Sequence, residues 1–356
     1  KNIFHLDELV ILKNGIEDGT LGKLNGSANK LKAVRTFMPD EYIKDSTKLG
    51  DIGEIITFID KYKINVSTAL LLLALNLLQR ENILCEISIQ NIIQNKKIHS
   101  QNNKIGEEIT AWLSATSLDE IREEYEYLLN CTLPHQRDVL GLIYQSLLLE
   151  GKKAQSGSYY TPEIIVNKIV KDLAKKDTKF LDPCCGTGQF LLSFAEVIDN
   201  PQNIYGIDND EIAVRIARLN ILIKYKNFDF SPNIIYKNTL FEIGNYDLFS
   251  LNDENIKDFD IIATNPPWGV HFSQTDIKRL KKTYPEINSL ESFSYFIRKS
   301  ISLLRKNGIA SFILPESILN VKTHSDVREI ILRNTQVKRV SYLNRVRLLN
   351  TPYIIT

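Results

Sequence analysis

The chain has 356 residues, of which 43% are hydrophobic and 24% are charged, and its formal net charge at pH 7 is +1. This composition excludes a disordered, collagen-like or disulfide-dense secreted protein, and the length fits two or three domains with sizeable cores. The four cysteines (Cys85, Cys131, Cys184 and Cys185) lack zinc-ligand and redox spacing, which predicts a reduced, cytoplasmic protein without a bound metal. The most apolar run, 69–78, is about half a membrane span, so we expect a buried helix and no membrane partner.

Charge is unevenly distributed along the chain. Residues 1–150 hold 16 basic and 21 acidic side chains, whereas residues 278–347 hold 15 basic and 5 acidic ones. A local excess of this size is typical of a surface that binds a polyanion, and equally of a solvated lysine- and arginine-rich face. Because the chain starts with Lys1 and not with Met, we expect it to be part of a longer protein.

Residues 1–150 are predicted to form a mainly helical N-terminal domain. Apolar residues at helical spacing predict helices over about 51–62, 67–79, 117–130 and 136–150. Ser117-Leu118-Asp119-Glu120 fits a capping box, which predicts Ser117 as the N-cap of the third helix. The polar segment 151–158 then predicts a linker, and we place the start of a second domain, 151–356, at this point.

Strands alternate with helices in the second domain. Strands are predicted over about 179–182, 203–208, 233–236, 259–264, 309–314 and 337–343, and helices over about 162–175, 188–198, 210–224, 289–306 and 325–334. Thr161 is predicted as the N-cap of the first of these helices, and Gly308 as the C-cap signal of the helix before it. The alternation predicts an α/β protein with a parallel, doubly wound sheet.

A glycine-rich turn follows the first predicted strand of this domain. Asp182 ends the strand, and Gly186-Thr187-Gly188 leads into the next helix. Glycines here let the backbone approach a ligand at the carboxyl end of the strand, where a carboxylate can receive the ammonium of an amino-acid-like ligand. The same pattern is also typical of a plain tight turn, so alone it leaves both interpretations open.

Asp208 ends the next predicted strand, 26 residues after Asp182. Acidic residues that bind ribose hydroxyls in nucleotide-binding folds occupy this place, about 20 residues past the glycine-rich loop. The alternative is an aspartate that only caps the following helix. Because the glycine-rich turn precedes it, we favour the ribose interpretation.

Asn265-Pro266-Pro267-Trp268 follows the predicted strand at 259–264. Two consecutive prolines cannot continue a central strand, so they fix a rigid turn. The turn offers the Asn265 side-chain oxygen and the Pro266 carbonyl as acceptors beside the aromatic face of Trp268, an arrangement that suits a planar amino group. The alternative is a proline-rich turn with a half-buried tryptophan.

These motifs, in this order, resemble a known enzyme family. The chain is similar to the gamma class of amino-methyltransferases that modify adenine N6 in DNA, which includes the modification subunits of type I restriction–modification systems. The segments that carry the resemblance are 157–162, 182–188 and 265–268, with further similarity at 138–144 and 311–317. The resemblance covers roughly residues 136–345 and implies a Rossmann-like methyltransferase fold with S-adenosylmethionine as the methyl donor.

The resemblance also implies roles for the residues of the cofactor site. Contacts to the methionine end of the cofactor fall to Tyr159, Tyr160 and Thr161, the amino group to Asp182, packing beneath the cofactor to Gly186 and Gly188, and the ribose hydroxyls to Asp208. The family usually has aspartate where this chain has Asn238, and asparagine can still accept a hydrogen bond from the cofactor's adenine amino group through its side-chain oxygen but carries no charge. Cys184 and Cys185 are interpreted as packing residues.

By the same resemblance, Asn265, Pro266, Pro267 and Trp268 are the catalytic residues and double-stranded DNA is the substrate. The target adenine has to be flipped out of the duplex to be reached. A separate specificity or restriction subunit is an expected partner, and no target-recognition region is evident in the chain. The alternative is an N-methyltransferase that acts on RNA guanine or on a protein glutamine amide, whose motif is similar but whose chain is expected to lack the Tyr-Thr-Pro motif and the long helical leader.

Overall fold

A computed structural model describes residues 46–94, 98–117, 121–148, 161–242, 257–342 and 352–356. The predicted linker 151–158, the predicted cofactor residues Tyr159 and Tyr160, and most of the predicted capping box at 117–120 lie outside these ranges. Within them, no helix combines the length and the apolar character that crossing a bilayer requires.

Seven strands in the described ranges form one sheet, in the order β3-β2-β1-β4-β5-β7-β6. They are β1 (Phe180–Asp182), β2 (Ile204–Asp208), β3 (Asn233–Tyr236), β4 (Phe259–Thr264), β5 (Leu304–Pro315), β6 (Val340–Tyr342) and β7 (Pro352–Ile355). The pairings from β3 to β5 are parallel, as predicted, whereas β7 is antiparallel to both of its neighbours. The expectation of a wholly parallel sheet is therefore wrong at this edge, because the short segment between β6 and β7 cannot hold a parallel crossover.

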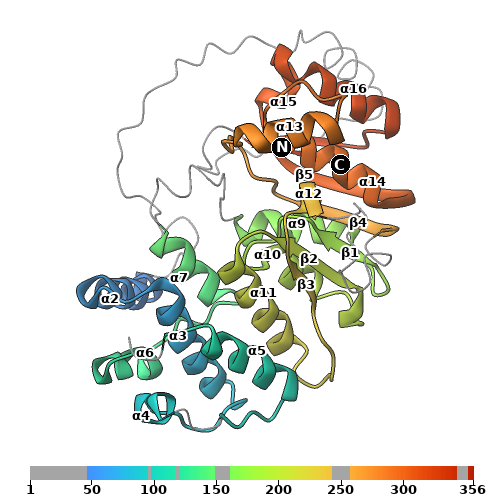
Figure 1. Cartoon of the computed structure of the whole chain (residues 1–356). Helices are drawn as coiled ribbons and strands as arrows, with labels where there is room; N and C mark the ends of the chain where they lie inside the picture. Colours follow the sequence, from blue (N-terminus) through green and yellow to red (C-terminus); the bar gives the residue numbers. More distant parts are fainter. Residues whose placement is uncertain (1–45, 95–97, 118–120, 149–160, 243–256, 343–351) are drawn as a thin grey trace.

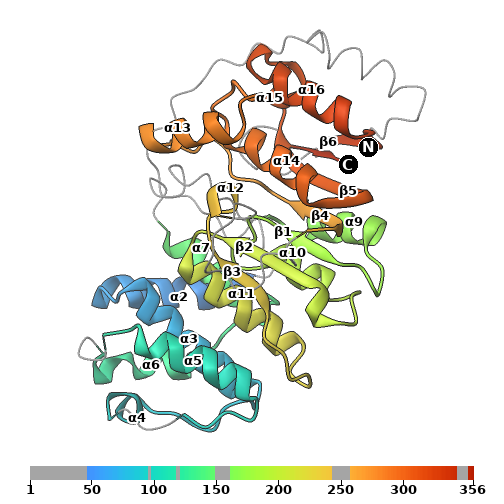
Figure 2. The same cartoon turned by 45° about the vertical axis from the view of Figure 1, so that its right-hand side comes forward.

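Helices cover both faces of the sheet (Figures 1 and 2). One face packs on α9 (Glu163–Leu173), α10 (Gln189–Phe194) and α11 (Glu211–Lys224), and the other on α14 (Ser292–Leu303) and α16 (Ser325–Asn334). The strands alternate between the two cores, since Phe180 belongs to the first and Leu181 to a cluster on the other face. The shorter α12 (Thr239–Glu242), α13 (Gln274–Thr283) and α15 (Ser317–Asn320) were not predicted from the sequence.

Two predicted helix ends in this part of the chain are wrong. Gly308 lies within β5, because α14 already ends at Leu303 and the strand pairing with β4 shifts register at this point. A side chain at Gly308 would meet the Phe259 carbonyl oxygen at 2.8 Å, so the close approach of two strands explains the glycine. Pro162, with extended backbone angles, is the N-cap of α9 in place of Thr161.

The N-terminal region is helical, as predicted, with α2 (Ser46–Tyr62), α3 (Val66–Arg80), α4 (Ile89–Ile93), α5 (Asn103–Ser114), α6 (Glu126–Asn130) and α7 (Val139–Leu147). The helix predicted over 117–130 is wrong in length, since α6 starts only at Glu126 after the 3-10 turn Glu123–Tyr125, and α5 was not predicted at all.

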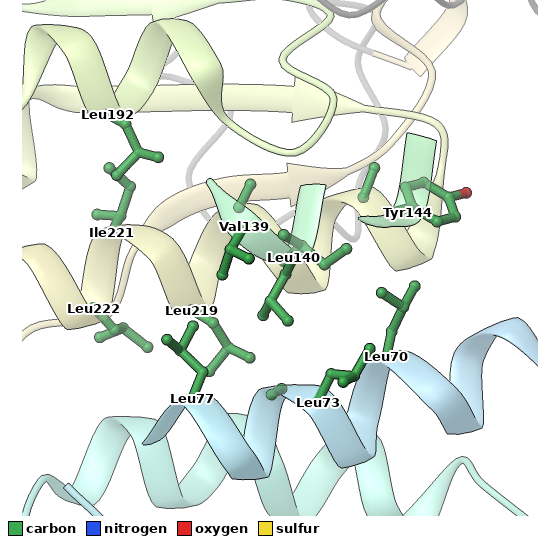
Figure 3. Close-up of a cluster of buried hydrophobic side chains, with 14 of the residues drawn as sticks. Leu70, Leu73, Leu77, Val139, Leu140, Tyr144, Leu192, Leu219, Ile221 and Leu222 are labelled. Atoms are coloured by element: carbon green, nitrogen blue, oxygen red, sulfur yellow. The ribbon is translucent and has the colours of Figure 1, made fainter. Parts of the chain in front are cut away.

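The helical region shares one apolar core with the sheet-covering helices. Figure 3 shows leucines of α3 pointing toward α7 and toward α11, with Leu73 and Leu77 facing Leu140 and Leu219. All four side chains are buried. Helix α7 packs on α2, α3 and α11, and α5 also packs directly on α11, so both elements join the helical region to the helices that cover the sheet.

Candidate active site

A cavity of about 620 Å³ opens at the carboxyl ends of the parallel strands. This is the edge where open α/β sheets bind their ligands. The residues of the predicted site that line it are Thr161, Asp182, Gly186, Asp208, Asn238, Asn265 and Pro267. The structure thus gathers most of the predicted site, drawn from five separate stretches of the chain, around one space.

Asp182 ends β1 and is almost completely buried at the base of the cavity. Its Oδ1 accepts hydrogen bonds from the Cys184 backbone N–H at 3.1 Å and from the Thr264 hydroxyl at 2.6 Å. Burial raises the pKa of Asp182 to about 7, although both hydrogen bonds oppose this. No lysine or arginine of the described residues pairs with Asp182, so its buried carboxylate favours a positively charged ligand group.

Asp208 closes the glycine-rich loop onto β2. Its Oδ2 accepts from the Gly186 backbone N–H at 2.8 Å, and its Oδ1 accepts from the Asp210 N–H at 2.9 Å. Burial raises the pKa of Asp208 to about 6. The cap of α11 is Asp210 and not Asp208, since the Asp210 side chain accepts from the first backbone N–H groups of that helix. The helix-cap alternative for Asp208 is therefore wrong.

Asn265 follows β4, and both its side-chain nitrogen and its side-chain oxygen bear on what the site can bind. Its amide nitrogen donates to the Thr161 hydroxyl at 3.1 Å, so the Tyr-Thr-Pro motif orients this side chain. Its Oδ1 is buried and has no hydrogen-bond partner in the structure as described. The Ser292 hydroxyl donates to the Pro267 carbonyl and thereby fixes the turn from α14. A buried acceptor without a donor is costly, which indicates that a ligand supplies the donor.

Three predicted residues, Gly188, Pro266 and Trp268, lie around the cavity without lining it. Gly188 is the left-handed N-cap of α10, with φ of 97°. Trp268 is half-buried and packs against the hydrophobic clusters on both faces of the sheet, and Pro266 is buried. Asn238 does line the cavity, but its Oδ1 also accepts from the Leu240 N–H at 3.1 Å.

Several aromatic residues that sequence reasoning missed line the cavity, among them Phe272 and Phe296. Phe272 follows the turn at 265–268 and Phe296 lies on α14, and neither belongs to a motif that marked it as a ligand contact. Only the packing of α14 against the turn at 265–268 brings them to the site.

A buried hydrogen-bond centre, also missed, joins α7 to the glycine-rich loop. The Asp138 carboxylate caps α7 by accepting from the Gly141 N–H at 3.0 Å. It also accepts from the Thr187 hydroxyl at 2.6 Å and from the Asn220 amide at 2.8 Å. A side chain at Gly141 would come within 2.4 Å of this carboxylate and of the Thr187 hydroxyl, so close packing explains the glycine. The sequence signal was the segment 138–144, which resembled the family but had no assigned role.

A second contact from α7 reaches the end of β2. The Tyr144 hydroxyl donates to Asp210 Oδ2 at 2.5 Å. The neighbouring carboxylate and burial both raise the pKa of Tyr144, so the phenol stays protonated as a donor. Together, Asp138 and Tyr144 tie α7 to the two segments that carry Gly186 and Asp208.

The fold and this site define an α/β methyltransferase architecture with a ligand cavity at the carboxyl edge of its sheet. A family model described as N-6 DNA Methylase matches residues 135–351, which is more than half of the chain. The chain therefore belongs to the N-6 DNA methylase family.

Known proteins agree with this assignment. The chain is 30% identical over 202 residues to the type II methyltransferase M.VspI of Vibrio sp. (strain 343), covering 56% of this chain and 47% of that protein. It is 28% identical over 227 residues to the EcoEI methylase subunit of a type I restriction enzyme from Escherichia coli, covering 55% and 44%. The chain thus spans less than half the length of either relative.

A solved structure of a DrdV–DNA complex superposes with a TM-score of 0.56 at 15% identity, covering 98% of this chain and 40% of that one. At this identity the likeness concerns the fold alone.

Proposed function

We propose that this protein transfers a methyl group from S-adenosylmethionine to the N6 amino group of a flipped-out adenine in double-stranded DNA, as part of a restriction–modification or related defence system. The observation that carries the proposal is the buried, unpartnered Oδ1 of Asn265 at the edge of the cavity. Membership of the N-6 DNA methylase family supports the same reaction.

The cavity fits the proposed cofactor. Its volume lies in the range of small-molecule sites, about 300–1,000 Å³. Asp182 supplies a buried negative charge for the ammonium group, and Asp208 at the end of β2 supplies acceptors for ribose hydroxyls. Gly188 lets α10 start directly beneath the loop, because its left-handed backbone strains other residues.

The chain's own residues would act on adenine by position and electrostatics. When bound, S-adenosylmethionine supplies an electrophilic methyl group on a sulfonium sulfur. Asn265 Oδ1 would accept a hydrogen bond from one N6–H and the Pro266 carbonyl from the other, which favours a pyramidal nitrogen whose lone pair is free to attack; the proton that N6 loses on methylation would pass to solvent. Thr161 holds the Asn265 amide so that Oδ1 faces the base. Such positioning needs no covalent enzyme intermediate.

Asn265→Ala tests this role. We expect turnover to fall by about 100-fold or more, as when a single preorganised hydrogen-bonding group is removed, while the dissociation constant of the cofactor changes little. The exposed Asn227→Ala is the matched control and should leave both quantities unchanged. An Asn265→Ala variant with near-wild-type turnover would refute the proposed chemistry.

The substrate is tested with the complete protein and methyl-labelled S-adenosylmethionine. DNA, total RNA and release factor are offered separately, and the product is identified by mass spectrometry. N6-methyladenine in DNA is the expected product. Label only in RNA or only in protein would instead favour one of the two alternative acceptors.

Helix α13 supports DNA as the substrate. It begins six residues after Trp268, and its residue Asp276 lines the cavity. Lys278, Lys281 and Lys282 are exposed, and in the described ranges none of them forms an ion pair with a carboxylate. Arg279 on the same helix stacks on Phe241, with the guanidinium carbon 4.3 Å from the ring centroid. Unpaired cations beside the mouth of the cavity suit the phosphates that flank a flipped base.

Salt dependence measures how many phosphates these lysines neutralise. Replacing the three lysines of α13 by alanine should weaken DNA binding and lower the slope of log affinity against log salt by about 0.9 for each phosphate that is no longer neutralised. The control replaces Lys171, Lys175 and Lys306 by alanine. These lysines are also exposed but lie toward the amino ends of the strands, away from the cavity. Equal slopes for the two triple variants would refute a phosphate-binding role for α13.

The proposal extends to partners and location. Because one similar protein is a methylase subunit of a type I restriction enzyme, a separate specificity or restriction subunit is a candidate partner for this chain. The division into a helical domain, 1–150, and a catalytic domain, 151–356, and a cytoplasmic location are parts of the same proposal.

A further inference from the structure

The helical region forms one wall of the cofactor cavity. Val66 at the start of α3, and Tyr144, Gln145 and Leu148 at the end of α7, line the same space as Asp182 and Asp208. These four residues precede the glycine-rich loop in sequence, and none of them belongs to the motifs that predicted the cofactor site.

Gln145 is a polar residue of this wall whose side chain has no hydrogen-bond partner among the described residues. Its side chain is only 6% exposed, yet it lines the cavity. In the structure as described, its amide forms no hydrogen bond, whereas the Tyr144 hydroxyl beside it is taken up by Asp210. The amide lines the cavity and not the packed core, so its donor and acceptor are open to the molecule that occupies this space.

Gln145 is also held in a fixed place. At the start of α7, Asp138 binds Thr187 of the glycine-rich loop and Asn220 of α11, at 2.6 and 2.8 Å. Near the end of the helix, Tyr144 binds Asp210. With both ends of α7 tied to the segments that carry Gly186 and Asp208, the Gln145 amide is positioned before a ligand arrives. Such preorganisation lowers the entropy lost on binding.

We propose that Gln145 is a cofactor-binding residue, whose amide hydrogen bonds to S-adenosylmethionine from the wall formed by the helical region. This inference rests on the proposed function, because it takes the ligand of the cavity to be that cofactor. It makes α7 part of the cofactor site itself, and so makes cofactor binding depend on the docking of the helical region.

The test compares Gln145→Leu and Gln145→Glu with the wild-type complete protein by calorimetry. The probes are S-adenosylhomocysteine and 5′-methylthioadenosine, which lacks the amino-acid part. We expect Gln145→Leu to weaken the binding of S-adenosylhomocysteine by about 10-fold, which corresponds to about 1.4 kcal/mol. Unchanged 5′-methylthioadenosine binding would place the contact on the amino-acid part, and equal weakening of both ligands would place it on the adenosine part.

Thermal stability separates a binding role from a structural one. Leucine is close to glutamine in size, and the Gln145 amide forms no hydrogen bond with the described residues, so the ligand-free Gln145→Leu variant should melt close to the wild-type temperature. The control is Ser146→Ala, whose hydroxyl donates within α7 to the Leu142 carbonyl at 2.8 Å and does not line the cavity. Ser146→Ala should leave ligand affinity unchanged.

Two results would overturn the inference. One is unchanged affinity for both ligands in both Gln145 variants. The other is a lowered melting temperature of the ligand-free Gln145→Leu variant together with a parallel loss of affinity, which would assign Gln145 to the fold and not to the ligand. A wild-type protein that binds neither ligand would instead refute the proposed cofactor, so the two failures are distinguishable.

Discussion

Replacing Asp138 is expected to remove the hydrogen bonds that join α7 to the glycine-rich loop. The carboxylate is 1% exposed and accepts from the Gly141 N–H, the Thr187 hydroxyl and the Asn220 amide. Asp138→Ala leaves these three donors without that acceptor, although the Asn220 amide keeps a second bond to the Thr187 carbonyl at 3.0 Å. At about 1–3 kcal/mol for each stranded buried group, we expect a loss of about 3–5 kcal/mol in the free energy of unfolding.

Asp138→Asn should be much milder. Its Oδ1 can still accept from Gly141 and Asn220, and its amide nitrogen can donate to Thr187, whose hydroxyl rotates to accept. We expect a cost of about 1 kcal/mol at pH 7, the net worth of one hydrogen bond. The dissociation constant of the cofactor should rise in this variant, because the glycine-rich loop is anchored by the same Thr187 hydroxyl.

The burial of Asp138 fixes the sign with which its contribution to stability depends on pH. Burial raises the pKa of Asp138 to about 6, above its ordinary value, so the folded protein holds a proton that the unfolded chain has already lost between about pH 4 and 6. Asp138 therefore contributes a loss of up to about 3 kcal/mol of wild-type stability as pH rises through this window, and the Asn variant lacks this contribution. The difference in free energy of unfolding between the wild type and Asp138→Asn should thus be larger at pH 4.5 than at pH 8.

Urea denaturation of both variants and the wild type at these two pH values measures the effect. The difference between wild type and Asp138→Asn cancels the contributions of the other buried carboxyl groups. The reasoning is refuted by an Asp138→Ala variant within about 0.5 kcal/mol of the wild type, which is the usual range for surface substitutions. A pH-independent difference between wild type and the Asn variant would refute the burial argument.

Three further outcomes are expected. Burial raises the pKa of Asp182 to about 7, and a bound ammonium group favours the charged form of this carboxyl. Cofactor affinity should therefore rise between pH 6 and 8, and binding should release a proton, which calorimetry in two buffers measures. A flat pH profile of the affinity would contradict this. Gly188→Ala should lower the free energy of unfolding by about 1–3 kcal/mol, because the φ of Gly188 is 97° and a Cβ there would lie 3.3 Å from α11. Gly186→Ala is the control and should cost less, because a Cβ at Gly186 meets nothing. Equal melting temperatures of the two variants would contradict this prediction. Thr161→Val should lower turnover at saturating cofactor by about 10-fold, because it frees the Asn265 amide. Unchanged turnover in a single-turnover assay at saturating cofactor would exclude this orienting role.

Several elements of the catalytic region could be read from local sequence. The predictions for β3 and β4 match the structure at both ends, and β1 and β2 differ by one residue. Short apolar runs bounded by glycine, proline, asparagine or aspartate leave little choice of conformation, so the strands and the turn after β1 follow from nearby residues alone.

Local signals failed where packing competed with them. Gly308 reads as the end of a helix, but the approach of β5 to Phe259 of β4 needs a glycine at the same place. Thr161 reads as an N-cap, yet its hydroxyl accepts from Asn265, 104 residues further along the chain. Each local preference is worth about 1 kcal/mol, which a single tertiary contact can outweigh.

The sequence by itself therefore determined the strands from β1 to β4 and the glycine-rich turn after β1, because these depend on short-range patterns. Only the tertiary structure decided that β7 runs antiparallel, that Thr161 orients Asn265, and that Asp138 ties α7 to the glycine-rich loop. These features join residues far apart in sequence, such as Asp138 and Asn220, which are 82 positions apart. Their hydrogen bonds form only when the shared apolar core brings the helical region and the sheet together.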